Sequence, residues 1–249
     1  MTKIKKASFR FYEELNDFLP QNRRKKRFVH NFIDRTSVKD MIESLGIPHT
    51  EVDLILVNGA SVDFSYLVKD GDDISVYPVF ESLDITNTQH LRPKPLRNPK
   101  FVLDVHLGTL AKYMRMLGFD TLYKNNYNDE EIVDISLREK RTILTRDRGL
   151  LKRADVTHGY WIRENKTENQ LIEVINRFDI KKLIRELSRC LLCNSKLIKI
   201  SKDKVLDLVP KKVKEYQNEF YLCEHCNKIY WKGSHYNKMK GIIDKLKLF

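Results

Sequence analysis

The stretch "TILTRDRGLLKR", residues 142–153, opens as a short buried strand and then turns abruptly charged. In open α/β sheets, ligands bind just beyond the carboxyl ends of the strands, and Asp147 stands at such a position between Arg146 and Arg148. This placement suggests that Asp147 binds a metal ion while the two arginines contact a phosphate backbone. The plain alternatives are a turn-forming or helix-capping aspartate and two solvated arginines.

Around this stretch, short apolar runs alternate with amphipathic segments. Strands are predicted at 100–104, 119–124, 141–145 and 160–164, and helices at 108–118, 129–140 and 167–178. The last of these helices begins with Thr167 and Gln170 at the spacing of a capping box. Repeated strand–helix–strand units build a mostly parallel sheet covered by helices, so this part of the chain is predicted to be an α/β domain.

Two further acids occupy positions comparable to that of Asp147. Asp104 ends the first predicted strand, and Asp129 opens a predicted helix. Three carboxylates at one edge would repel one another unless a cation neutralised them, and all-oxygen ligation suits Mg²⁺ or Mn²⁺. Such an ion can activate water for in-line hydrolysis of a phosphodiester. We therefore predict that Asp104, Asp129 and Asp147 form a catalytic metal site.

The net charge of +12 is unevenly distributed along the 249 residues. Residues 1–90 carry −2, residues 91–180 carry +4, and residues 181–249 carry +10. The excess in the last third predicts a polyanionic partner there, most simply a nucleic acid, although a solvated basic surface would give the same count. No apolar run approaches the ~18 residues of a membrane span, and the basic N-terminus lacks a signal-peptide core, so a cytoplasmic protein without membrane contact is expected.

The four cysteines form two C-x₂-C pairs separated by 29 residues, namely Cys190 with Cys193 and Cys223 with Cys226. Two such pairs can place four thiolates tetrahedrally around a structural Zn²⁺, here in a ribbon whose middle forms a hairpin. The alternatives are two disulfides, which are rare in the cytoplasm, or reduced core cysteines. His225 and His235 are possible replacement ligands. We predict a zinc ribbon over residues 181–249.

Aromatic and basic residues interleave after the second cysteine pair, in "CNKIYWKGSHYNKM". Aromatic rings and lysines together suit base stacking and phosphate contact on single-stranded RNA. Lys232 and His235 are therefore predicted to contact RNA. For Trp231, packing in the small core of the ribbon is at least as good an explanation.

The first 80 residues show short strands, one compact helix and good turn signals. Ser37 can cap a helix that ends at Gly46, and Asn58-Gly59 is a strong hairpin signal. The segment, above all "LILVNGASVDFSYLVKDGDDISVYPVF", resembles a ubiquitin-like β-grasp domain of α+β type, especially the small sulfur carriers. Because no Gly-Gly pair follows residue 80, we interpret it as an interaction or regulatory module that binds a protein partner.

Residues 100–240 resemble the Mut-seven C-terminal ribonuclease family, a branch of the PIN-domain nucleases. The motifs that carry the resemblance are "LDVHLGTLAKYMRMLGFDT", the acidic "NDEEI" and "LTRDRGLL". The resemblance implies a metal-dependent ribonuclease with a PIN-like fold, in which Asp104, Asp129 and Asp147 bind the metal. Arg115, on the helix predicted at 108–118, is expected to contact nucleic acid. Many PIN nucleases have a fourth acid; Asp120, Asp155 and Glu130 are the candidates here.

These observations predict four parts: a β-grasp domain over 1–83, a proline-containing linker over 84–99, a PIN-like nuclease domain over 100–180, and the zinc ribbon. The expected function is endonucleolytic hydrolysis of RNA with Mg²⁺ or Mn²⁺. The alternatives are a non-catalytic RNA-binding adaptor, or a toxin-like nuclease restrained by a protein partner or by its own first domain.

Overall fold

The computed structural model describes residues 4–33, 35–78, 99–234, 236, 237, 240, 241 and 244. The chain divides into two compact units, residues 1–97 together with 147–161, and residues 98–146 together with 162–249. Each unit is described by itself. The predicted linker lies outside the described residues except for its last position, residue 99.

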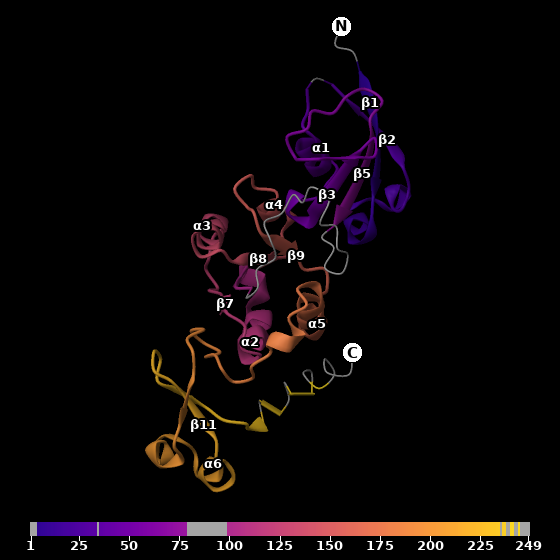
Figure 1. The fold of residues 1–249 in the computed structure, drawn as a ribbon. Coiled ribbons are helices and arrows are strands. Elements are labelled where there is room, and N and C mark those ends of the chain that lie inside the picture. The colour runs from indigo at the N-terminus through magenta and orange to yellow at the C-terminus, as the bar shows by residue number, and fades with distance from the viewer. Residues whose placement is uncertain are drawn as a thin grey trace. The chain divides into compact units, whose positions relative to one another are not determined.

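The first unit is built on a five-stranded sheet with the order β2-β1-β5-β3-β4. Its central pair, β1 and β5, is parallel, and the other neighbours are antiparallel. One helix, α1, lies against the sheet (Figure 1). This is the arrangement of the predicted β-grasp domain, and its elements are β1 (Lys5–Phe11), β2 (Phe28–Phe32), α1 (Val38–Ser44), β3 (Val52–Val57), β4 (Ala60–Val62) and β5 (Asp73–Pro78).

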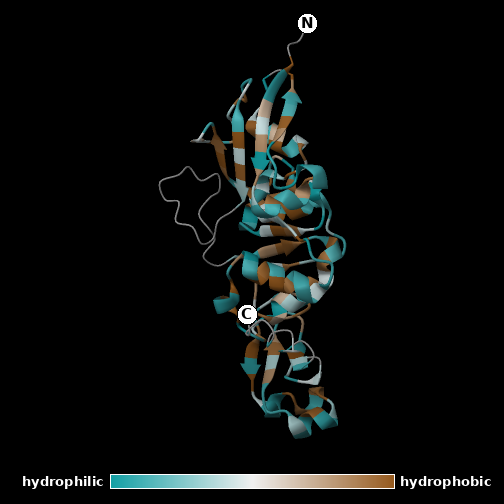
Figure 2. Ribbon diagram, turned by 90° about the vertical axis from the view of Figure 1, so that its right-hand side faces the viewer, coloured by the Kyte–Doolittle hydropathy of each residue, from teal (hydrophilic) through white to brown (hydrophobic). Residues whose placement is uncertain are grey.

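Local signals in the sequence fix the turns of this sheet. The Ser37 side chain accepts a hydrogen bond from the backbone N–H of Asp40 and so caps α1, while Gly46 ends that helix at a φ of 101°. Asn58 and Gly59 both have positive φ, at 51° and 84°, as the tight hairpin between β3 and β4 requires. Along β1 and β5 buried residues alternate with more exposed ones. Figure 2 shows hydrophobic and hydrophilic residues mixed along the strands of the protein.

The sequence analysis placed residues 147–161 inside the nuclease domain. In the structure they form one compact unit with residues 1–97. They form α4 (Arg148–Leu151) and β9 (Gly159–Trp161). Within this unit β9 lies beside the 3₁₀ turn His49–Glu51, and Trp161 packs against the hydrophobic core of the β-grasp sheet. We refer to residues 147–161 as the docked segment.

The second unit contains a parallel sheet in which β6 (Phe101–Leu103) lies between β7 (Thr121–Leu122) and β8 (Thr142–Thr145). Every residue of β6 and β8 is buried, as expected for parallel strands covered on both faces. The helices of this region are α2 (Gly108–Met116), α3 (Asp129–Glu139) and α5 (Thr167–Arg177). The predicted strand–helix alternation is therefore confirmed as a mixed α/β fold.

One helix start was predicted wrongly. The N-cap of α5 is Lys166, which makes no side-chain cap, so Thr167 is the first helical residue and does not open a capping box. The Gln170 side chain instead donates to the carbonyl of Glu164 (2.9 Å). A complete capping box does occur at α3, between Asn128 and Glu131.

The last part of the second unit is a three-stranded antiparallel sheet of β10 (Ile198–Ile200), β11 (Phe220–Cys223) and β12 (Lys228–Tyr230). Val205, Val209 and Phe220 form its small core, against which Trp231 packs. Between the cysteine pairs, β10 and β11 form the antiparallel pair that the predicted hairpin requires, and 3₁₀ turns and the helix α6 (Lys211–Tyr216) connect them.

Short 3₁₀ helices complete the described elements: Glu13–Phe18, Gln21–Arg23, Val105–Leu107, Lys181–Leu183, Lys202–Lys204 and Leu206–Leu208, besides the turn His49–Glu51. Within the described part of the chain, no helix has the length and apolar character that a membrane crossing needs.

Candidate active site and metal centre

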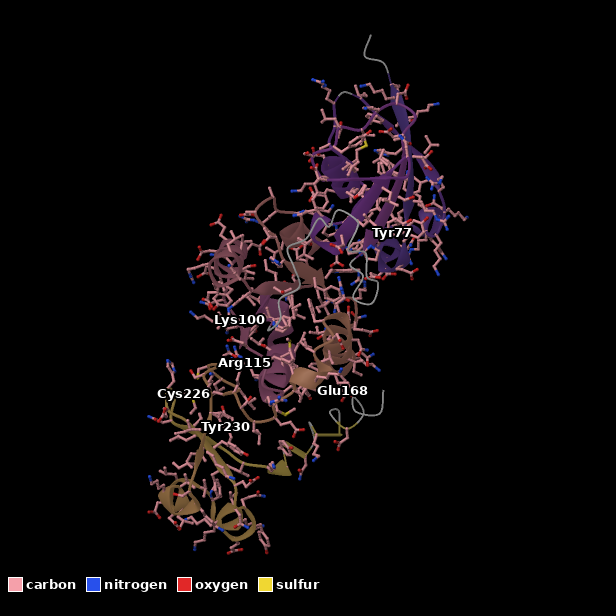
Figure 3. All side chains as sticks on the ribbon, in the orientation of Figure 1. Tyr77, Lys100, Arg115, Glu168, Cys226 and Tyr230 are labelled. Carbon is pink, nitrogen blue, oxygen red and sulfur yellow. The ribbon has the colours of Figure 1, made fainter. Side chains whose placement is uncertain are left out.

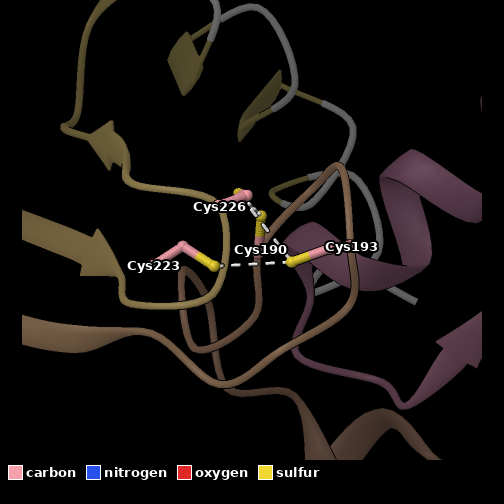
Figure 4. A group of neighbouring side chains, drawn as sticks. All are labelled: Cys190, Cys193, Cys223 and Cys226. Atoms are coloured by element: carbon pink, nitrogen blue, oxygen red, sulfur yellow. Dashed lines mark hydrogen bonds between the residues drawn. The ribbon is translucent and has the colours of Figure 1, made fainter.

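The four cysteines come together as predicted, and we call them the cysteine centre (Figure 4). Their sulfur atoms all lie within 4.8 Å of one another, and the Cys190–Cys226 and Cys193–Cys223 distances are 3.4 Å. Tetrahedral Zn–S bonds of about 2.3 Å require sulfur atoms roughly 3.8 Å apart. All four thiols are free, which excludes the two-disulfide alternative in this structure. The spacing and the donor chemistry fit a metal such as zinc.

The thiols of the cysteine centre differ in acidity because they share one crowded site. Burial favours the neutral form of Cys193, but hydrogen bonds involving Ser195 and Cys223 outweigh burial and lower its pKa to about 6. Burial and hydrogen bonds to neighbouring sulfurs raise the pKa of Cys226 to about 12. The Tyr230 hydroxyl lies 3.1 Å from the sulfur of Cys190, where it can orient this thiol.

Arg115 connects α2 to the first cysteine pair. It is only 3% exposed, and its guanidinium donates to the carbonyls of Thr121 (2.8 Å), Leu191 (3.0 Å) and Leu192 (2.8 Å). Burial lowers the pKa of Arg115, although the nearby cysteine thiols act in the opposite direction. Figure 3 labels Arg115 on this helix. The geometry supports a structural role that the sequence did not suggest, and the nucleic-acid contact of Arg115 stays a prediction.

Asp120, one candidate for the fourth acid, is the centre of an ion-pair network. Its carboxylate accepts from Arg141 (2.7 Å), Arg189 (3.1 Å) and the Asn194 side chain (2.7 Å). Burial alone would raise the pKa of Asp120, but these donors outweigh it and hold the pKa below its usual value. The network connects the parallel sheet to the first cysteine pair, which gives Asp120 a structural role.

We expect Asp120→Asn to destabilise the protein by roughly 3 kcal/mol, because the buried Arg141 loses one of its two carboxylate partners and Arg189 loses the same carboxylate. Asp134→Asn is the matched control: the side chains of Asp134 and Arg138 are 66% and 61% exposed, so its loss should cost under ~1 kcal/mol. The pKa of Asp120 is lower in the folded state than in the unfolded state. The difference in free energy of unfolding between wild type and Asp120→Asn should therefore be largest near pH 7 and shrink below about pH 4. Urea unfolding at several pH values measures it; equal effects of the two variants would contradict the assignment.

Asp104 is the best-organised acid of the predicted catalytic set. It follows β6 and is 6% exposed; one carboxylate oxygen accepts from the backbone N–H of Val105 (2.5 Å) and the other from the Thr145 hydroxyl (2.7 Å). Thr145 is fully buried at the carboxyl end of β8, so two neighbouring parallel strands fix this carboxylate at the predicted edge of the sheet.

A pocket of about 350 Å³ opens at the same edge. Its polar side chains come from the start of α2, the end of β8 and the start of α5, and we call it the sheet-edge pocket. The Arg146 guanidinium lies in it and donates to the side chain of Asn165 (2.5 Å). The residues that line it are His106, Leu107, Thr109, Leu110, Arg146, Asn165, Thr167 and Gln170. The sequence analysis missed His106 and Asn165: His106 stands inside the motif that begins at Leu103 but was given no role, and Asn165 stands in no quoted motif.

The other two predicted catalytic acids each stand at the start of a helix. Asp129 is exposed and is the first residue of α3. Asp147 is the N-cap of α4, and one of its carboxylate oxygens accepts from the backbone N–H of Gly149 (2.7 Å). Among the described residues, the cysteine centre is the one group of three or more His, Cys, Asp or Glu close enough to share an ion. The shared aspartate site stays a prediction.

The remaining predicted nucleic-acid contacts have different environments. The Arg148 guanidinium stacks on aromatic rings of the first unit. Lys232 is exposed, and its ammonium lies 3.1 Å from the carboxylate of Glu219, which raises the pKa of Lys232. His235 lies outside the described residues. Contact with nucleic acid stays a prediction for these three residues.

Comparison with family models matches residues 99–243 to the Mut7-C RNAse domain and residues 4–84 to the Mut7-C ubiquitin domain. No match was found among curated proteins or among solved structures. The RNAse-domain match spans more than half of the 249 residues, and both matches agree with the resemblances drawn from the sequence. The chain therefore belongs to the Mut7-C RNAse domain family and carries a ubiquitin-like domain of the Mut7-C type at residues 4–84.

Proposed function

We propose that this chain is a PIN-type endoribonuclease that hydrolyses RNA phosphodiester bonds with Mg²⁺ or Mn²⁺. The observation that carries the proposal is the position of Asp104, a buried and doubly hydrogen-bonded carboxylate at the carboxyl end of a parallel sheet, in a chain of an RNAse-domain family. The four clustered cysteines suit metal-binding thiolates rather than disulfides, and thiolates persist in a reducing compartment, which for this protein we propose to be the cytoplasm.

The sheet-edge pocket supplies the chemistry that a phosphate needs. Arg146 brings a fixed positive charge, and His106 and Asn165 bring hydrogen-bonding groups. Thr109 and Thr167 lie in the first turns of α2 and α5, where the helix dipoles also favour an anion. We propose that this pocket binds the phosphate backbone of the substrate.

Asp104, Asp129 and Asp147 are the residues that would hold the divalent ion. Carboxylate oxygens are the ligands that Mg²⁺ and Mn²⁺ prefer. When bound, the ion supplies an activated water and neutralises charge on the phosphate. This part of the proposal rests on ligand chemistry and on the places of the three residues in the chain, at the ends of two strands and at the start of a helix.

The C-terminal part of the second unit is proposed to bind zinc in the cysteine centre and to hold the RNA strand. A cavity of about 640 Å³ lies between α2 and β12, with Tyr113, Tyr230 and Trp231 in its wall and Lys112 and Lys228 beside them. Rings and lysines in one cavity suit stacked bases and their phosphates. Residues 181–249 carry a net charge of +10, which favours the same partner.

The proposal predicts internal cutting of single-stranded RNA that depends on a divalent ion. The purified 249-residue chain is incubated with end-labelled linear RNA and with circular RNA, in metal-free buffer and after addition of Mg²⁺ or Mn²⁺. We expect linearisation of the circle only when the ion is present. Zinc content is measured in each sample, so that loss of zinc is not mistaken for loss of the catalytic ion.

The same experiment separates a second candidate, a non-catalytic RNA-binding adaptor. This alternative is favoured by one observation: among the described residues, only the cysteine centre forms a ready metal-ligand group. An adaptor would bind RNA equally with and without Mg²⁺ or Mn²⁺ and would leave both substrates intact under every ion tried.

A further inference from the structure

The ubiquitin-like domain binds the docked segment through hydrogen bonds between residues distant in the chain. His49 Nε2 lies 2.8 Å from the carbonyl oxygen of Val156, 107 positions away. The Lys152 ammonium donates to the carbonyl of Glu43 (2.9 Å), 109 positions away. All these residues lie within the first unit, and the contacts are spread over most of the docked segment.

A third hydrogen bond joins the ubiquitin-like domain to the end of the docked segment. The Glu51 side chain is fully buried, and it accepts from the backbone N–H of Trp161 (2.8 Å) across 110 positions. A carboxylate is costly to bury unless it is hydrogen-bonded, and this bond to the backbone of Trp161 helps to hold the end of the docked segment. This end is β9, beside the 3₁₀ turn that contains Glu51.

The start of the docked segment is held by stacking. The Arg148 guanidinium lies 4.0 Å from the ring centroid of Trp161 and 5.0 Å from that of Phe18, and the two rings are themselves 4.8 Å apart. Phe18 is buried in the core of the β-grasp sheet. An arginine in this position is fixed by cation–π contacts with both rings.

Arg148 is the residue next to Asp147, and Asp147 caps the helix α4 that Arg148 begins. Fixing Arg148 therefore fixes the backbone that carries the Asp147 carboxylate. A displacement of about 1 Å in a reacting group can cost about 10²-fold in rate.

We propose that the ubiquitin-like domain is a built-in positioning element of the nuclease: Phe18, Glu51 and His49 hold the docked segment so that Asp147 is correctly placed. The proposal rests on the ribonuclease function proposed above. It also assigns Arg148 to anchoring the segment, whereas Arg146 in the sheet-edge pocket contacts the substrate. Phe18, Glu51 and His49 act through Asp147 and are positioning residues.

Hydrogen exchange tests the anchoring without any need for activity. In the Phe18→Ala variant of the 249-residue chain, the backbone amides of residues 147–161 should exchange at least ~10-fold faster than in wild type, while the exchange of the β6 and β8 amides is unchanged. Phe28→Ala is the matched control, because Phe28 also stacks with an arginine, Arg23, at 4.9 Å but makes no contact of this kind with the docked segment. Equal exchange of residues 147–161 in both variants would overturn the anchoring. Trp161→Phe, which keeps an aromatic ring, should retain most of the protection.

Steady-state cleavage then tests the positioning. Phe18→Ala and Arg148→Ala should each lower kcat by about 10²-fold, with RNA affinity and its salt dependence unchanged. Arg146→Ala should instead weaken RNA binding. It should also reduce the slope of log Kobs against log salt concentration by about one, because one phosphate contact is lost. Faster exchange with unchanged kcat would overturn the positioning role, and a rise in kcat would show that the domain restrains the nuclease instead. A wild type that cuts no RNA would overturn the proposed function and the positioning role with it, while the exchange data would still decide the anchoring.

Discussion

Asp104→Asn is expected to lower the rate of RNA cleavage by at least about 10³-fold while leaving the fold intact. The magnitude follows from the loss of one fixed charged group in a preorganised site. Asparagine has the shape of aspartate, and its side-chain oxygen can still accept from the N–H of Val105, as the Asp104 carboxylate does at 2.5 Å. Its amide can donate to the Thr145 hydroxyl, so the edge of the sheet keeps its hydrogen bonds.

Thr145→Val is the companion variant. It preserves the shape of a fully buried side chain but removes the hydroxyl that donates to Asp104 at 2.7 Å. The carboxylate keeps its charge but loses one of its two orienting donors, so we expect a smaller loss of rate than in Asp104→Asn. Cleavage of end-labelled RNA with Mn²⁺ measures both variants, with circular dichroism as the check of folding. A well-folded Asp104→Asn that cleaves at the wild-type rate would remove Asp104 from the active site.

Short-range signals in the sequence were sufficient for most elements. The serine cap of α1, the Asn58-Gly59 hairpin and the alternation of strands with amphipathic helices each depend on a few neighbouring residues, and the structure confirms all of them. The cysteine centre was also predictable, because two C-x₂-C pairs with no other cysteine in the chain leave little choice of partner.

Long-range packing explains what the sequence could not show. The docked segment is held by His49, Glu51 and Phe18, and no local pattern connects residues some hundred positions apart. Arg115 looks like an exposed helical arginine in the sequence, but it is buried because the carbonyls of Leu191 and Leu192 lie against α2. Thr167 and Gln170 have the spacing of a capping box, but Thr167 is the first residue of α5, and Lys166 is the N-cap.

Cys193→Ser is expected to abolish stoichiometric zinc binding and to unfold the small sheet β10–β12. Structural zinc sites contribute about 10–16 kcal/mol in isolated peptides, far more than a core of Val205, Val209 and Phe220 can supply. Strand β11 ends at Cys223, whose sulfur lies 3.4 Å from that of Cys193, so loss of the ion frees one end of the sheet.

The effect of Cys193→Ser should extend into α2. Leu191 and Leu192 hold the Arg115 guanidinium through their carbonyls, and a disordered first cysteine pair would leave this buried cation without two of its acceptors. We therefore expect a lower melting temperature for the whole second unit and weaker RNA binding, measured by calorimetry and by fluorescence anisotropy beside the metal content. Ser195→Ala is the control: it removes a hydrogen-bonding partner of Cys193 but no ligand, so zinc should be retained. Full zinc content in Cys193→Ser would refute the four-cysteine assignment.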